Sequence, residues 1–310
     1  MKRYFFSLIL ILTLVSCNEE QSVFKIGKRI VVRPNEVQTI SPTDSIRGSC
    51  FDGFNGLLCA ADSVLVFHLT DATGYCLRAL DLRTNNTVDF LRIGRGPDEI
   101  LMGYFSGNRK VAGRTLLDIC AMNEGLLLSV DLEETLQAGQ AVIADRMEIL
   151  PFATASFVLG NEILSEVVND IDIFSYKLYD RESQTISRTL LPFGMDEYYA
   201  YYQPLFSAPK KMRPDGTKLC MGMVFFDELN ILDVRGDGHL SVSTSKKTKD
   251  IETLNHTLET GELGHRYYYT TLSVTQDNIF TLYYGDASIK NKGLSRTLVH
   301  VYSWDGQDYR

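Results

Sequence analysis

Three charged side chains in one glycine- and proline-containing corner are the first candidates for chemistry in this sequence. Arg95, Asp98 and Glu99 lie within the six residues that follow the apolar run ending at Ile93. One hypothesis places them at the mouth of a channel, where they bind a polar ligand. The alternative is a structural corner, in which the three charges pair with one another and cap backbone groups. Loops of this type usually connect elements, so the structural interpretation is favoured.

Tyrosines form the second candidate site. Four of them stand within five positions, next to two acidic residues: Tyr198, Tyr199, Tyr201 and Tyr202. A tyrosine offers a flat apolar face and a polar tip, which suits a sugar or a peptide at a surface. No strand alternation accounts for this spacing. The sequence therefore predicts a binding platform, with plain aromatic packing as the alternative.

Known catalytic and metal-binding patterns are not found. The sequence has no GxSxG, HExxH or P-loop motif, and its five histidines are scattered. The stretch 233–239 lacks the spacing of a calcium loop and fits a glycine-rich turn better. We therefore expect no metal and no cofactor, and we assign no catalytic residue. A hydrolase or lyase whose residues converge on a channel from separate strands remains the alternative.

The residues from Ser63 to Glu99 indicate which elements position these side chains. Runs of β-branched and aromatic residues too short for helices, such as 64–67 and 88–93, are separated by turn-forming residues such as Asn85. Asparagine tolerates a positive φ, which a tight hairpin needs. This stretch therefore predicts three consecutive antiparallel strands closed by the Gly/Pro corner.

Hairpin signals recur along the rest of the chain, near Asn86, Gly139, Ser183, Asp237 and Asp305. A spacing of roughly 40–50 residues of strands is typical of propeller blades. Long amphipathic helical stretches do not interrupt the strands, which disfavours a parallel βαβ architecture. The sequence therefore predicts an all-β fold, a β-propeller.

The N-terminus predicts export. Lys2 and Arg3 precede the apolar run Tyr4–Val15, which is too short to span a bilayer as a helix and is typical of a secretory signal. The sequence Leu14-Val15-Ser16-Cys17 is similar to a bacterial lipobox, which implies cleavage before Cys17 and lipid attachment to its thiol. An ordinary signal peptide with an incidental cysteine is the alternative.

These signals divide the chain into three parts. Residues 1–16 are the expected lipoprotein signal peptide, residues 17–25 the lipidated cysteine and its tether, and residues 26–310 the propeller domain. Removal of residues 1–16 changes the net charge from −8 to −10, because two basic residues leave with them. An acidic, exported chain without a basic stripe is a poor candidate for nucleic-acid binding. It is also a poor candidate for adsorption to anionic headgroups, so the lipid anchor is the expected contact with the membrane.

The repeated strand triplets, the lipobox, the corner with Gly94, Gly96, Pro97 and Glu99, and the Pro214–Gly216 turn resemble the TolB-like six-bladed β-propeller lipoproteins of Bacteroidetes. The similarity covers most of residues 24–304. It implies six four-stranded sheets around a channel, in a lipoprotein of the outer membrane whose biochemical role is largely undefined. We therefore expect a lipid-anchored binding module of the cell envelope, with a protein or glycan partner.

The strand count falls short of six blades. The sequence contains five units of strands, together with the runs 29–33 and 36–40, which are able to close the ring. Asp305–Gly306 is a strong hairpin signal, yet the chain ends at Arg310. Two expectations follow: a ring that closes with fewer strands, or a propeller that lacks its last blade. A truncated family member without independent activity is the corresponding alternative for function.

Overall fold

The computed structural model describes residues 27–35, 37–39, 54–96, 98–168, 175–191, 205–246, 256, 260, 266–288 and 298–307. The candidate residues Cys17, Tyr198, Tyr199, Tyr201 and Tyr202 lie outside this part of the chain. Within it, nearly all regular structure is β-strand, which confirms the all-β prediction. The strands are short and rich in β-branched and aromatic residues, which pack well on a pleated surface.

The first two sheets follow each other along the chain. The first contains β2 (Phe54–Ala61), β3 (Val64–Leu69), β4 (Tyr75–Asp81), β5 (Asn86–Ile93) and β6 (Glu99–Ile100), in that order. The second contains β7 (Tyr104–Val111), β8 (Arg114–Ala121), β9 (Leu126–Asp131) and β10 (Ile143–Glu148). Neighbouring strands are antiparallel, except that β6 runs parallel to β5. The three strands predicted within 63–99 are β3, β4 and β5, so that prediction is confirmed.

Three further sheets complete the described chain. The third contains β11 (Ala153–Leu159), β12 (Glu162–Val167), β13 (Ser175–Asp180) and β14 (Thr185–Leu190). The fourth contains β15 (Lys210–Met212), β16 (Lys218–Gly222), β17 (Leu229–Asp233), β18 (His239–Ser243) and β1 (Lys28–Val31). The fifth contains β19 (Arg266–Val274), β20 (Asn278–Ser288) and β21 (Leu298–Ser303).

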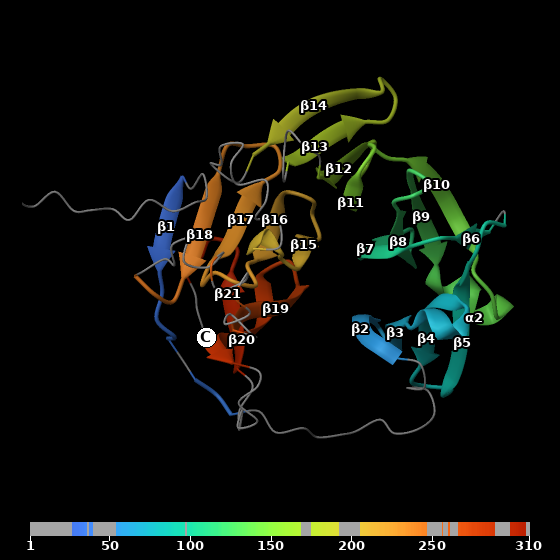
Figure 1. Ribbon diagram of the computed structural model, residues 1–310, viewed down its shortest axis with the longest axis horizontal. Coiled ribbons are helices and arrows are strands. Elements are labelled where there is room, and N and C mark those ends of the chain that lie inside the picture. The colour runs from blue at the N-terminus through green and yellow to red at the C-terminus, as the bar shows by residue number, and fades with distance from the viewer. Residues whose placement is uncertain are drawn as a thin grey trace, which may run out of the picture.

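These sheets are arranged as the blades of a β-propeller. The first strands β2, β7, β11, β15 and β19 surround the centre, and each sheet extends outward from its first strand (Figure 1). The described residues form five such blades, so the expectation of a six-bladed type is wrong for this part of the chain. The physical reason lies in the number of strands, because five meander units account for all five sheets. The additional strands β6 and β1 each join an existing blade.

Strand β1 was expected to help close the ring, and the structure places it elsewhere. It pairs in parallel with β18, with Lys28 opposite Leu240 and Val31 opposite Ser243, and thereby adds a fifth strand to the fourth sheet. Residues 37–39 of the second expected run are described and are not in a strand. A parallel strand added at an outer edge covers that edge without forming a blade of its own.

The hairpin predicted near Gly139 is a helix end. Helix α2 (Leu132–Ala138) begins at Asp131, whose carboxylate accepts a hydrogen bond from the backbone N–H of Glu134. Gly139 ends it with a φ of 68° and donates its N–H to the carbonyl of Thr135. A glycine at positive φ serves a hairpin turn and a helix C-cap equally well, which is why the sequence signal was ambiguous. Among the helices of the described residues, none has the length and apolar composition of a membrane span.

Apolar side chains pack between consecutive blades, and this packing holds each blade to the next along the chain. Buried clusters join the first blade to the second, the second to the third, the third to the fourth and the fourth to the fifth. In the third of these clusters Tyr176 and Leu178 pack against Leu219 and Met221. Full burial of one such side chain contributes about 1.5–3 kcal/mol, so each blade depends on its neighbours for stability.

Candidate functional site

Two cavities lie along the central channel, one at each end of the inner strands. Late residues of β7, β11 and β15 line a cavity of about 630 Å³, which we call the exit cavity. Early residues of β7 and β11, together with the residues just before β15, line a cavity of about 800 Å³, which we call the entry cavity. Both volumes lie in the range of small-molecule sites.

The exit cavity is rich in positive charge although the chain as a whole is acidic. Its lining contains five cationic side chains and two carboxylates: Arg109, Lys110, Lys211, Arg213 and Arg235, with Asp118 and Asp215. Four of the cations have a carboxylate within 3.4 Å, namely Asp118 for Arg109, Asp62 for Lys110, Asp215 for Arg213 and Glu162 for Arg235. Lys211 is the exception, because none of its ion-pairing distances to the described carboxylates falls within 4.0 Å. It therefore supplies the net positive charge of the cavity.

The surroundings of Lys211 are apolar. Its side chain is half-buried, and its Nζ lies 4.9 Å from the centre of the Phe105 ring on the second blade. Burial lowers the pKa of the Lys211 amine, and the nearby Cys59 and Cys220 thiols act weakly in the opposite direction. Burial also raises the pKa of Cys59 to about 11, so this neighbour is an uncharged thiol at neutral pH. The protonated Lys211 amine thus has no described carboxylate within ion-pairing distance, and a bound anion would favour this protonated form.

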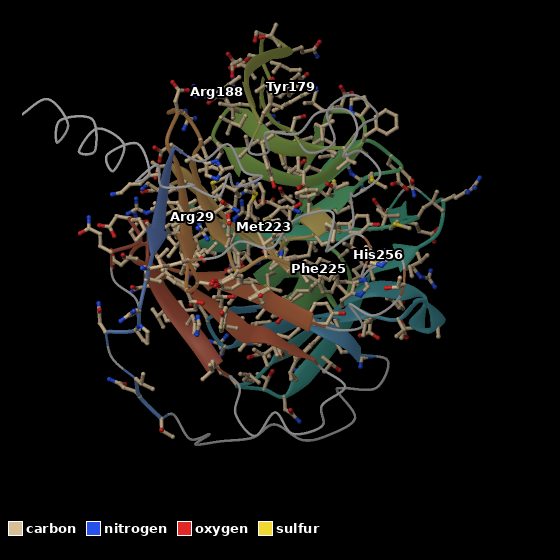
Figure 2. The ribbon with its side chains drawn as sticks, turned by 60° about the vertical axis from the view of Figure 1, so that its left-hand side comes forward. Arg29, Tyr179, Arg188, Met223, Phe225 and His256 are labelled. Carbon is tan, nitrogen blue, oxygen red and sulfur yellow. The ribbon has the colours of Figure 1, made fainter. Side chains whose placement is uncertain are left out.

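The wall around Lys211 is fixed by contacts between blades. Arg188 of β14, labelled in Figure 2, lies at the third blade. It donates to the carbonyl oxygens of Arg235 (3.2 Å) and Gly236 (2.7 Å) and pairs with Asp237, which ties the third blade to the fourth. On the other side, Arg213 Nε donates to the carbonyl oxygen of Gln276 at 3.0 Å. These contacts hold the turns that carry Arg213 and Arg235 at the edge of the cavity.

The entry cavity has a different chemistry. Much of its lining is apolar, including Leu58, Ile93, Leu101, Met102, Tyr104, Phe105 and Phe157. Leu101, Met102 and Tyr104 are 41–45% exposed, so they form an apolar rim in contact with water. Such a composition is typical of sites for ligands with a large apolar part.

One ion pair is built into the wall of the entry cavity. Glu166 is 3% exposed and lies 2.9 Å from Lys210 Nζ. The same carboxylate accepts hydrogen bonds from Thr154 Oγ1 at 2.6 Å and from Tyr176 OH at 3.0 Å. Burial, and then the charge of Glu166, raises the pKa of Tyr176 well above its ordinary value, so its hydroxyl remains a donor. The pair is internally neutral and leaves no excess charge in this cavity.

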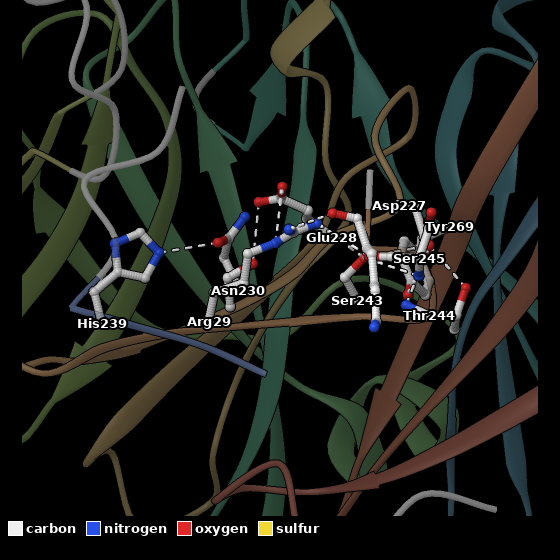
Figure 3. A network of polar contacts seen from close by, with 11 residues as sticks. Arg29, Asp227, Glu228, Asn230, His239, Ser243, Thr244, Ser245 and Tyr269 are labelled. Carbon is white, nitrogen blue, oxygen red and sulfur yellow. Dashed lines mark hydrogen bonds and ion pairs between the residues drawn. The ribbon is translucent and has the colours of Figure 1, made fainter. Parts of the chain in front are cut away.

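A second polar cluster, between the fourth and fifth blades, is structural. Figure 3 shows Asp227 accepting hydrogen bonds from Thr244 Oγ1 at 2.7 Å and from Tyr269 OH at 3.4 Å. In the same cluster Arg29 of β1 donates to Ser243 Oγ at 3.3 Å and to the carbonyl oxygen of Ser245 at 3.2 Å. These residues line neither channel cavity, and their contacts fasten β1 to the end of β18.

The corner predicted as a ligand site lies at the outer edge of the first blade. Glu99 accepts a hydrogen bond from the backbone N–H of Gly96 at 2.8 Å, and Asp98 pairs with Arg146 of β10 at 2.5 Å. Arg95 is exposed, and none of the three predicted residues lines the entry or the exit cavity. The observed contacts of Asp98 and Glu99 are those of a structural corner, and ligand binding there stays a prediction.

The remaining predictions concern residues outside the described part of the chain, or partners. The tyrosines at 198, 199, 201 and 202 and the lipid attachment at Cys17 remain predictions, as does the protein or glycan partner. Among the described residues, no group of three or more His, Cys, Asp and Glu side chains is placed to hold a metal ion.

The sequence patterns did not point to Lys211. One signal was present, because Lys210, Lys211 and Arg213 stand within four positions directly before the Pro214–Gly216 turn. Neighbouring residues of a strand point to opposite faces, so this run had to deliver its charges to two different environments. The sequence does not show that Glu166 neutralises Lys210 whereas Lys211 has no such partner.

Comparisons with known proteins add little beyond the fold. No model of a protein family matches the chain, and no curated protein matches it either. Similar solved structures include a putative exported protein from Bacteroides fragilis NCTC 9343, with 11% identity over 95% of this chain and 77% of that chain and a TM-score of 0.47. A member of the DUF4221 family from Bacteroides vulgatus ATCC 8482 has 13% identity over 79% of this chain and 76% of that chain, with a TM-score of 0.44.

Hsv2 of Kluyveromyces lactis is a third similar structure, with 10% identity over 80% of this chain and 59% of that chain and a TM-score of 0.39. All three TM-scores are below 0.5, so these likenesses carry no argument about family or activity. The resemblance to the TolB-like family is not confirmed by them. The β-propeller fold follows from the sheets of this chain.

Proposed function

We propose that this chain is an exported, lipid-anchored β-propeller that acts as a binding module of the cell envelope, and that its ligand presents an anionic group to Lys211. The observation that carries the binding site is the half-buried ammonium group without a carboxylate partner in the exit cavity. The predicted export signal and the lipobox-like sequence Leu14–Cys17 support the proposed location at the cell envelope.

The desolvation of the Lys211 ammonium group favours the binding of an anion. A charged group that loses water without gaining a partner destabilises the protein. The Phe105 ring offsets about 0.5–1 kcal/mol of this cost through a cation–π contact. A carboxylate or phosphate group of a ligand would supply the missing partner in a partly dry cavity, where the attraction is stronger than in water.

The four paired cations around Lys211 have a supporting role. Their carboxylate partners neutralise their charge at short range, so they do not provide free binding positions. Arg213 and Arg235 also contact neighbouring blades, through the carbonyl oxygen of Gln276 and the carboxylate of Glu162. Such contacts hold the cavity wall in one geometry, and a preorganised site loses less conformational entropy when a ligand binds.

The proposal is tested by thermal unfolding of the purified protein with citrate as an anionic probe at low ionic strength. A ligand that binds only the folded state raises the melting temperature. We expect citrate to stabilise the wild-type protein and to lose most of this effect in Lys211→Met. Without citrate, Lys211→Met should be at least as stable as the wild type, because the substitution removes an unpaired charge.

Lys28→Met is the matched control, since Lys28 is an exposed lysine on β1, outside both cavities. It removes the same charge and should keep the full citrate effect. If Lys211→Met retains that effect, or if it strongly destabilises the ligand-free protein, Lys211 is a structural residue and the proposed site is wrong.

A further inference from the structure

The exit and entry cavities meet inside the channel. Ser106 and Phe157 line both of them. Phe105 lines the entry cavity, and Lys211, whose ammonium group lies 4.9 Å from the centre of the Phe105 ring, lines the exit cavity. The Lys211 ammonium group therefore lies next to the entry cavity, with the Phe105 ring between them.

Polar groups at this junction are already satisfied by one another. Ser156 donates its backbone N–H to Ser106 Oγ at 3.1 Å, and the hydroxyls of Ser156 and Ser165 share a hydrogen bond of 2.9 Å. These buried groups do not compete for a ligand, so Lys211 is the strongest ligand-directed polar group where the two cavities meet.

The entry cavity favours an apolar occupant. Its Glu166–Lys210 pair is internally neutral, and Glu166 also receives hydrogen bonds from Thr154 and Tyr176. A ligand that brought a net charge into this cavity would lose hydration without gaining a partner. Apolar atoms, in contrast, gain contact with the surrounding side chains and release water.

We infer that the ligand is an amphiphilic anion, whose carboxylate or phosphate group contacts Lys211 and whose apolar chain occupies the entry cavity. This inference rests on the proposed function, namely that Lys211 binds an anion, and adds the chemical class of the rest of the ligand. Leu101, Met102 and Tyr104, at the exposed rim, cover the part of the chain nearest to solvent.

Calorimetric titration of the full protein with single-chain amphiphiles tests this inference. The probes are hexanoate, octanoate, decanoate, decyl phosphate and uncharged decanol. Affinity should rise about threefold to fourfold with each methylene group added between hexanoate and decanoate, as expected for burial of a hydrocarbon chain. Comparison of decanoate with decyl phosphate identifies which anionic group Lys211 accepts.

Two variants separate the head from the chain. Lys211→Met should weaken decanoate binding by about tenfold or more while leaving decanol binding unchanged, because only the charged contact is lost. Met102→Asp, at a rim position that is 45% exposed, should weaken both ligands without unfolding the protein. Ile186→Asp is its matched control, since Ile186 is 47% exposed on β14 outside both cavities.

The outcomes distinguish this inference from the proposed function. If hexanoate and decanoate bind with equal affinity and Lys211→Met weakens the binding of both, the proposed anion site is supported and the inference of an amphiphilic ligand is wrong. If Lys211→Met changes the binding of no anionic probe, both proposals are overturned. If Met102→Asp and Ile186→Asp lower the affinity for decanoate equally, that result also contradicts binding of the ligand's apolar chain in the entry cavity.

Discussion

Replacement of Lys210 by methionine tests how much a buried ion pair contributes to stability, in comparison with an exposed pair in the same fold. Lys210 and Glu166 lie 2.9 Å apart, and their side chains are 16% and 3% exposed. Lys210→Met removes the positive partner and leaves the Glu166 carboxylate buried. The chain offers a matched control, because Lys110 and Asp62 lie 3.0 Å apart with side chains that are 60% and 67% exposed.

The expected magnitudes differ because water screens only the exposed pair. Removing one partner of a buried pair typically costs about 3–5 kcal/mol. Glu166 keeps its hydrogen bonds from Thr154 and Tyr176, so we expect Lys210→Met to lower the free energy of unfolding by about 2–4 kcal/mol. Lys110→Met should cost less than about 1 kcal/mol.

Urea unfolding followed by circular dichroism measures both free energies. The double variant Lys210→Met/Glu166→Gln should recover at least half of the loss, because no unpaired carboxylate remains and a glutamine oxygen still accepts the Tyr176 hydroxyl proton. A Lys210→Met variant no less stable than Lys110→Met would refute the reasoning, since the Glu166 carboxylate would then be hydrated in the folded protein. If the double variant does not recover stability, the Lys210 side chain stabilises the fold through packing of its methylene groups and not through its charge.

Three further predictions concern other parts of the molecule. Burial lowers the pKa of His300 from 6.5 to about 4, so the folded state disfavours the protonated imidazole. The stabilisation should be complete above pH 6.5, and the free energy of unfolding should fall between pH 6.5 and 4 by up to about 1.4 kcal/mol per pH unit. Urea midpoints measured over that pH range should fall less for His300→Gln than for the wild type. A Cβ added at Gly94 would lie 2.0 Å from Glu99 Oε2, so Gly94→Ala should displace Glu99 from its hydrogen bond with Gly96 and lower the free energy of unfolding by about 1–2 kcal/mol. Gly107→Ala is the control, because its Cβ would meet no described atom within 4 Å, and it should cost less than about 0.5 kcal/mol in the same assay. Cys17→Ala should abolish membrane association, and incorporation of labelled fatty acid into that variant would contradict lipid attachment at Cys17.

Local features of the sequence predicted local features of the fold. The runs 64–67 and 88–93 became strands because alternation and β-branched residues act on the chain directly around them. Gly139 shows the limit of this approach: the sequence indicated a change of chain direction there, and the structure shows a helix C-cap in place of the predicted hairpin. At the Arg95–Glu99 corner, Glu99 caps a backbone N–H as the structural alternative had it. Asp98 instead pairs with Arg146 of the second blade, a long-range contact that the alternative did not include.

Long-range contacts decided the rest. The blade count depended on whether β1 begins a sixth sheet or joins β18, and Arg29 helps to settle this through Ser243, 214 positions away. The different roles of Lys210 and Lys211 depended on Glu166 and Phe105, which come from other blades.

The sequence by itself therefore determined the all-β class, because strand patterns depend on residues that are neighbours in the chain. The export signal rests on an equally local pattern and stays a prediction. Only the tertiary structure decided which lysine carries an uncompensated charge and which cavity is apolar. Desolvation and ion pairing depend on distances between blades, and a linear pattern does not contain those distances.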